Sequence, residues 1–247
     1  MKKIFKLVMS VLVLSFLVGC GGGGGSSNDS PGAISGLGDA SGEVTGEVFQ
    51  FPDGVILEGD VLGIGGSSLK VNNINQPNYY KPSFNAVTIT GANATIGSGS
   101  VYVRLVFSLN NTNNVDTEVV FPAGLVAIST TGDSQNGLLI KETSVVIPAN
   151  SRYKVVLIMY CANLHRATAG GYYYNNFFIV SNSSTLQELF DLVKDKKINN
   201  EEYDSSQSST YSNIVGNLQD IVWSITDDAN GLNDSHKEYI ANLPDSN

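Results

Sequence analysis

Cysteine, histidine and tryptophan are scarce in this chain, which has two cysteines, two histidines and one tryptophan in 247 residues. Cys20 falls in the N-terminal apolar stretch, so Cys161 is the single cysteine of the rest of the chain. A lone cysteine in an exported protein has no intramolecular disulfide partner. Cys161 is therefore either a core residue or a residue with its own chemistry.

Basic residues are also few, 14 Lys and Arg against 23 Asp and Glu, and the formal net charge is −9. Removal of residues 1–20 would take away three lysines and no acid, which changes that charge to −12. A body this acidic argues against nucleic acid and anionic lipid as partners.

Long apolar runs are absent except at the N-terminus, where three lysines precede an apolar core from Leu7 to Val18. That core is shorter than the ~20 residues of a membrane-spanning helix and is typical of an export signal. Leu17-Val18-Gly19-Cys20 resembles the lipobox of bacterial lipoproteins. The resemblance implies cleavage before Cys20, lipid on Cys20 and a lipid anchor in a membrane of the cell envelope. The alternative is an ordinary signal peptide with an incidental cysteine.

Glycine follows Cys20, and no aspartate is present there as a signal for inner-membrane retention. By resemblance to Gram-negative lipoproteins, this favours the outer membrane or cell surface. Residues 21–45 begin with a run rich in Gly and Ser and are predicted to be a flexible tether.

Residues 46–161 contain several strand-like runs separated by turn signals, which predicts a β-sandwich of two sheets. The central run is Arg152 to Cys161, whose near-continuous apolar character indicates a strand covered on both faces. Alternation places Tyr153, Val155, Leu157, Met159 and Cys161 on one face. Ser100 to Leu109 is a second clear strand. Other strands are predicted at 118–121, 125–129, 138–141 and 144–147.

Residues 162–247 change to a helical period, so the fold class is mainly β with α (α+β). Helices are predicted after Thr185, from about Ser212 to Thr226, and from Ser235 to Leu243, with a polar loop over 201–211. Gln219 falls at the edge of the apolar stripe of the second helix, near Trp223.

Two short motifs, Tyr160-Cys161 at a strand end and Leu218-Gln219-Asp220-Ile221-Val222-Trp223 on a helix, occur in this order 58 positions apart (161 to 219). The arrangement resembles the thioester domains of Gram-positive surface adhesins. The resemblance implies a bond between Cys161 and Gln219, with Tyr160 and Trp223 as aromatic cover. The family often has Thr where this chain has Leu218, and a small residue where it has Ile221.

The expected chemistry is attack of the Cys161 thiolate on the Gln219 carboxamide, with loss of ammonia. His165 or Arg166 would assist thiolate formation. A partner amine, on a protein or another surface molecule, would then displace the thiol and form an amide. This reaction has no turnover, so we predict an adhesin rather than an enzyme, with no cofactor and no metal.

Three alternatives remain open. In the main one, Cys161, Gln219 and Trp223 are core residues of a non-covalent structural or interaction lipoprotein. A Cys161–His165 hydrolase dyad is disfavoured because the two lie too far apart on a strand and no acid residue orients the histidine. The aromatic run Tyr172 to Phe178 is either a sugar- or protein-binding platform or a strand with a buried face.

Overall fold

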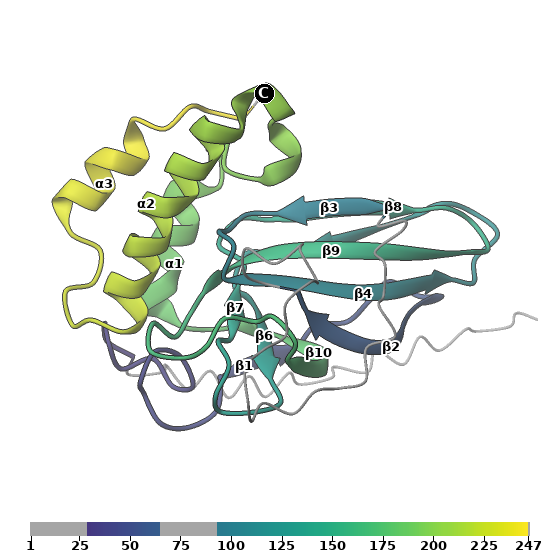
Figure 1. The fold of residues 1–247 in the computed structure, drawn as a ribbon, viewed down its shortest axis with the longest axis horizontal. Coiled ribbons are helices and arrows are strands. Elements are labelled where there is room, and N and C mark those ends of the chain that lie inside the picture. Colours follow the sequence, from purple (N-terminus) through teal and green to yellow (C-terminus); the bar gives the residue numbers. More distant parts are fainter. Residues whose placement is uncertain (1–28, 65–92, 247) are drawn as a thin grey trace, which may run out of the picture.

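The computed structural model describes residues 29–64 and 93–246, in which a β-barrel is followed by three helices (Figure 1). The predicted signal sequence and the predicted acylation site, Cys20, lie outside these residues. The strands are β1 (Gly46–Val48), β2 (Val55–Gly63), β3 (Ala94–Gly97), β4 (Val103–Asn111), β5 (Thr117–Phe121), β6 (Leu125–Ser129), β7 (Gly137–Leu138), β8 (Thr143–Ile147), β9 (Ser151–Cys161) and β10 (Tyr173–Ser181). The helices are α1 (Ser184–Val193), α2 (Ser208–Thr226) and α3 (Asp234–Ala241), with 3-10 turns at Asn200–Glu202 and Ser205–Gln207.

Six antiparallel strands close the barrel in the order β10-β2-β4-β9-β7-β6, and β6 pairs again with β10. β1 pairs with β10, and β3 pairs with β9 in parallel. β5 and β8 form a separate two-stranded sheet. The class predicted from the sequence, mainly β followed by helices, is confirmed. The predicted two-sheet sandwich is wrong, because β10 pairs with both β2 and β6 and so joins the two edges of the sheet.

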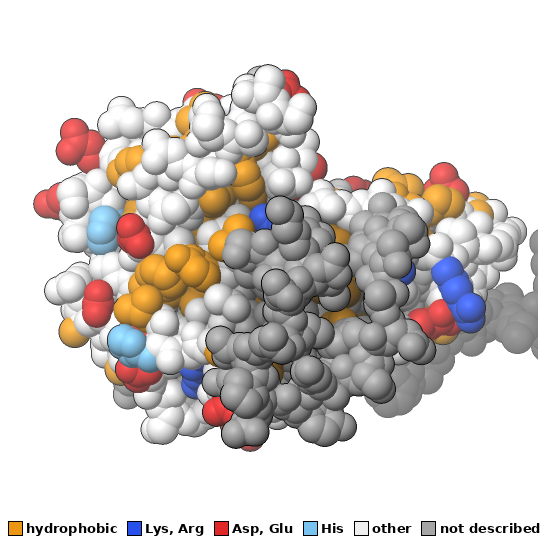
Figure 2. All heavy atoms as spheres, viewed as in Figure 1, with side chains coloured by type: hydrophobic (Ala, Val, Ile, Leu, Met, Phe, Trp, Pro, Cys, Tyr) orange, Lys and Arg blue, Asp and Glu red, His pale blue; other side chains and the backbone are white. Residues whose placement is uncertain are grey.

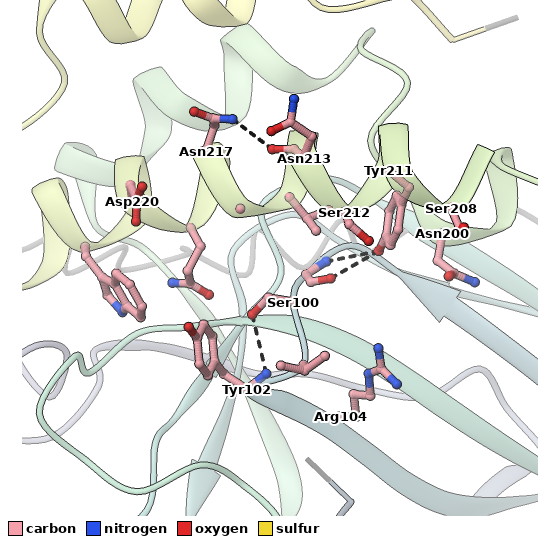
Figure 3. A pocket seen from close by; sticks show the side chains of 16 residues that line it. Ser100, Tyr102, Arg104, Asn200, Ser208, Tyr211, Ser212, Asn213, Asn217 and Asp220 are labelled. Carbon is pink, nitrogen blue, oxygen red and sulfur yellow. Dashed lines mark hydrogen bonds between the residues drawn. The ribbon is translucent and has the colours of Figure 1, made fainter. Parts of the chain in front are cut away.

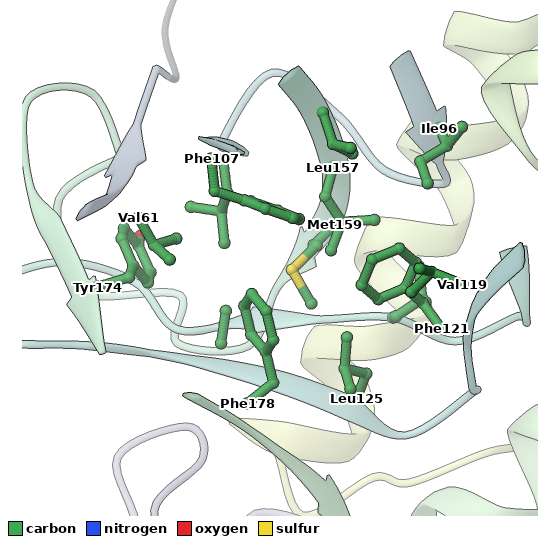
Figure 4. Packing of buried hydrophobic residues seen from close by; sticks show 14 of the residues in the cluster. Val61, Ile96, Phe107, Val119, Phe121, Leu125, Leu157, Met159, Tyr174 and Phe178 are labelled. Atoms are coloured by element: carbon green, nitrogen blue, oxygen red, sulfur yellow. The ribbon is translucent and has the colours of Figure 1, made fainter. Parts of the chain in front are cut away.

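The barrel interior is filled by apolar side chains from alternate positions of the strands (Figure 4). In this core Phe107 packs against Phe178 and Phe121, with ring centroids 5.7 Å and 6.2 Å apart. From β9, the buried residues of the predicted face point into this interior: Val155, Leu157, Met159 and Cys161. The interpretation of 152–161 as a central strand is confirmed, and both its faces are buried from Val155 to Cys161, whereas Arg152 is exposed.

The helices pack against one end of the barrel, as Figure 1 shows. Their apolar stripes and the outward-facing side chains of β6, β7 and β9 form a second core, which includes Tyr160 and Leu138 from the barrel and Leu186, Leu189, Leu218 and Val222 from the helices. All three predicted helices are present. The predicted polar loop over 201–211 contains two 3-10 turns, and α2 begins within it, at Ser208.

Part of the predicted tether belongs to the folded body. Ile34 and Leu37 are buried in the helical core, and the Gly38 N–H donates to the carbonyl of Ala162 at 2.7 Å. Gly38 has φ of 59°, and a Cβ at this position would lie 1.9 Å from the Thr226 carbonyl oxygen. Only glycine fits this close approach. The sequence predicted a flexible tether to residue 45, but apolar side chains anchor the chain from about Ile34.

Within the described part of the chain, no helix combines the length and apolar character needed to cross a membrane.

Candidate functional site

Cys161 is the last residue of β9, and its side chain is buried at the end of the barrel interior. On one side β7 covers it, with Gly137 opposite. On the other side β4 begins at Val103, opposite Met159, so no strand residue lies opposite Cys161. The backbone N–H and C=O of Cys161 therefore need partners from outside the sheet.

Gln219 of α2 supplies both partners. Its Oε1 accepts from the Cys161 N–H at 2.9 Å, and its Nε2 donates to the Cys161 carbonyl at 2.8 Å. The side chain is 1 % exposed, so these bonds form in a place that water does not reach freely. The side-chain amide thus continues the sheet edge where β4 is missing, as a peptide group of a neighbouring strand would. The structure brings together the two residues that the sequence proposed to react.

The Cys161 sulfur has its own polar contacts. Trp223, one helical turn after Gln219, donates its indole N–H to Sγ at 3.3 Å, and the Asn163 N–H points at Sγ from 3.5 Å. The thiol in turn donates to the Asn163 carbonyl at 3.4 Å. Burial raises the pKa of the Cys161 thiol to about 11, although the contacts from Asn163 and Trp223 act in the opposite direction. The thiol is therefore neutral at pH 7.

The other two residues predicted for this environment lie elsewhere. Tyr160 is fully buried on the opposite face of β9, under the helices, where its hydroxyl forms a 2.8 Å hydrogen bond with Ser98. The side chain of His165 is 66 % exposed, and its Nε2 lies 3.8 Å from a carboxylate oxygen of Asp39. Neither is a polar partner of the sulfur. Trp223 is the predicted aromatic neighbour that contacts it.

A pocket of about 670 Å³ opens beside this pair, between α2 and the segment 99–104 (Figure 3). Gln219 and Trp223 form part of its wall. Across from α2, Tyr102 and Arg104 line the pocket, and the Tyr102 ring lies 5.5 Å from the Trp223 ring, centroid to centroid. The buried Cys161–Gln219 contact is thus next to an open pocket.

Tyr102 and Arg104 were not predicted as site residues from the sequence; Arg104 is on β4, and Tyr102 directly precedes this strand. The signal that could have identified them is an aromatic and a charged side chain two positions apart at the start of a strand. Of the aromatic run Tyr172 to Phe178, Tyr174 and Phe178 point into the barrel, whereas Phe177 is 43 % exposed. Among the residues described, no cluster of His, Cys, Asp or Glu could hold a metal ion.

No protein-family model, no curated protein and no solved structure matches this chain. The class of protein that its geometry defines is a closed β-barrel with a helical cap and a buried Cys–Gln contact where the two meet.

Proposed function

We propose that this protein is a lipid-anchored exported protein of the cell envelope that attaches covalently to an amine-bearing surface partner, through a thioester between Cys161 and Gln219. One observation carries the proposal: the Gln219 carboxamide, on a helix 58 positions away in sequence, is fixed against Cys161 by two hydrogen bonds. Both bonds go to the backbone of Cys161, and they hold the carboxamide beside the residue whose thiol would react, which would lower the entropic cost of the reaction.

Bond formation would join Sγ of Cys161 to Cδ of Gln219 and break the Cδ–Nε2 bond. The thiol proton would leave with the nitrogen as ammonia. The Cys161 N–H, which already bonds Oε1 at 2.9 Å, would stabilise the negative charge that develops on that oxygen during attack. A partner amine would then add to Cδ and expel the Cys161 thiol, giving an amide and a free thiol.

The pocket supports this function because it opens against the wall that Gln219 and Trp223 help to form. The rest of the site is enclosed: Cys161 is fully buried and Trp223 covers its sulfur. Exclusion of water protects a thioester from hydrolysis.

A second function, that of a non-covalent structural or interaction lipoprotein of the cell envelope, is supported by the same hydrogen bonds. Both polar atoms of the Gln219 amide are satisfied by the Cys161 backbone, and the thiol has a pKa of about 11. In this function Gln219 fastens the helical cap to the barrel and no bond forms.

Peptide mapping of the purified mature protein by mass spectrometry tests the proposal. We expect the peptides that contain Cys161 and Gln219 to be linked, with one ammonia less than their summed mass. Methylamine should separate them, add to Gln219 and free one thiol. Glutamate at position 219 beside a free thiol would indicate a bond that had formed and hydrolysed.

The controls are Cys161→Ala and Gln219→Ala, each of which should abolish the linkage and the methylamine adduct. Asn217→Ala, an amide-to-alanine change on the exposed face of the same helix, should leave both intact. Unmodified Gln219 beside a free Cys161 thiol in the wild-type protein would contradict the thioester and leave the non-covalent function.

The anchor is tested separately. Cys20→Ser should release the protein from membranes or stop its maturation, because acylation needs the thiol. Unchanged partitioning into detergent would contradict the lipoprotein assignment. Cys161→Ser is the matched control and should remain membrane-bound.

A further inference from the structure

Arg104 has an unusual position for a charged side chain in this acidic protein. It projects from β4 into the pocket beside α2, and its Nε is buried without a hydrogen-bond partner in the structure as described. The described ion pairs instead involve other basic residues: Lys141, Arg152, His165, Lys196 and Lys237. A buried donor without a partner is costly, so the guanidinium is poised for an acceptor that a ligand brings.

The charge of Arg104 reaches the opposite wall of the pocket. Burial raises the pKa of the Tyr211 hydroxyl, and the positive charge of Arg104 is among the influences that oppose this shift. Tyr211 is held in place by its hydroxyl, which donates to the Gly99 carbonyl at 3.2 Å. The one carboxylate in the pocket lining, that of Asp220, belongs to an exposed residue of α2. Figure 3 shows Arg104 and Asp220 at opposite sides of the pocket.

The remaining walls suit a ring that carries hydroxyl groups. Tyr102 and Trp223 form an aromatic corner, with their planes tilted by 46°. Such flat apolar surfaces match the C–H face of a pyranose ring. Around this corner, the polar groups of the lining are mostly hydroxyls and side-chain amides, which both donate and accept hydrogen bonds as sugar hydroxyls do: Ser100, Ser208, Ser212, Asn213 and Asn217.

We infer that this pocket binds an acidic sugar, with the carboxylate on Arg104 and the sugar ring against Tyr102 and Trp223. The planar guanidinium forms two parallel hydrogen bonds with a carboxylate, which a lysine ammonium cannot do. The inference needs no bond between Cys161 and Gln219. It assigns the protein a non-covalent recognition site on the face that a partner would approach.

Trp223 is the only tryptophan of the chain, so its fluorescence reports directly on this pocket. We expect sodium glucuronate, added to the mature protein in detergent, to change that fluorescence saturably, and glucose and acetate to bind at least tenfold more weakly. Arg104→Gln should weaken glucuronate binding at least tenfold and remove the preference over glucose. Arg104→Lys, which keeps the charge, should give an intermediate loss and serves if the glutamine variant does not fold.

Arg152→Gln is the matched control, because its side chain is 76 % exposed and pairs with Glu58 away from the pocket lining. It should bind glucuronate as the wild type does. The inference is overturned if glucuronate gives no saturable change, if Arg104→Gln or Arg104→Lys binds it unchanged, or if glucose or acetate binds equally well. Tighter binding of a tetra-aspartate peptide would also overturn it, in favour of an acidic protein segment.

Discussion

The indole N–H of Trp223 donates to the sulfur of Cys161 across 62 positions of sequence, with the two atoms 3.3 Å apart. Gln219 precedes Trp223 by one helical turn, so one face of α2 supplies partners for both the side chain and the backbone of Cys161. Polar contacts that are buried or half-buried thus connect α2 of the helical cap to Cys161 of the barrel.

Loss of the Gln219 amide should destabilise the protein even when no thioester can form. In a Cys161→Ala background, Gln219→Ala leaves the N–H and C=O of residue 161 buried without partners. Each such group costs about 1–3 kcal/mol, so we expect the two together to lower the free energy of unfolding by about 2–6 kcal/mol. Urea unfolding at pH 7 measures it. Asn217→Ala in the same background should cost less than about 0.5 kcal/mol, and a loss below about 1 kcal/mol for Gln219→Ala would contradict the structural role.

The buried thiol should make the protein labile to alkali. The pKa of Cys161 is about 11 in the folded protein, against about 8.5 in an unfolded chain. Because the folded value is raised, its contribution to stability is complete below about pH 8.5 and is lost as the pH rises towards 11. At pH 10 the loss is roughly 2 kcal/mol.

Urea unfolding between pH 7 and pH 10, on protein treated with methylamine so that the thiol is free, checks this prediction. Cys161→Ser keeps the buried tyrosines, which also titrate at high pH, and should show a smaller decline between pH 8.5 and 10. The same decline in both proteins would assign the effect to the tyrosines instead.

A buried ion pair holds the C-terminal segment. The Lys141 ammonium lies 3.0 Å from the Glu202 carboxylate and also donates to the Ser246 hydroxyl at 2.6 Å. Lys141→Ala leaves the Glu202 charge partly buried and should cost about 3 kcal/mol. Arg152→Ala, which breaks an exposed pair with Glu58, should cost less than about 1 kcal/mol. Equal losses in thermal or urea unfolding would contradict this difference.

The same pair predicts the response to acid. Burial alone would raise the pKa of Glu202, but hydrogen bonds from Ser246, Asn199 and Lys141 hold it below its ordinary value. Because the folded value is depressed, the stabilisation is present above the unfolded pKa of about 4.3 and is lost as the pH falls through the folded value. Lys141→Ala should therefore reduce the pH dependence below about pH 4.

The N-terminal anchor of the folded body is tested by Leu37→Ala. Leu37 is fully buried in the helical core, so the change should cost about 2–4 kcal/mol. Val48→Ala, at a side chain that is 49 % exposed, should cost less than about 0.5 kcal/mol. A flexible tether that ran to residue 45 would give no loss for either variant.

The three helices and the strands from β4 to β9 could be predicted from the sequence because each depends on a local period, whereas β1, β2 and β3 were not predicted. β9 is recognisable because both its faces are covered, and α2 because its apolar stripe recurs every three or four residues. Closure of the barrel could not be predicted, since alternation along a strand is the same in a sandwich and in a barrel. The closing strand β10 was assigned to the helical part, and its pairing with β2 and β6 depends on contacts distant in sequence.

The Cys161–Gln219 contact was proposed from two short motifs, and the structure brings the two residues together. The orientation of the amide was not predictable, because it follows from the start of β4 at Val103, which leaves the Cys161 backbone without a strand partner. The alternation of β9 was sufficient to place Tyr160 on the face opposite Cys161. Arg104 was overlooked because a single charged residue on a strand is uninformative until its neighbours in space are known.

Residues near the start of the described chain pair with β10 and α2, which are made much later. These contacts therefore limit the order in which the protein can fold. Gly32 bonds to the carbonyl of Ile225, and β1 pairs with β10. Contacts between such distant parts close long loops, which slows folding. In a chain made from its N-terminus, β1 must wait for β10, and Gly32 must wait for the end of α2. Ile34 and Leu37 can therefore be buried only after α2 has been made, whereas the barrel can close as soon as β10 is available.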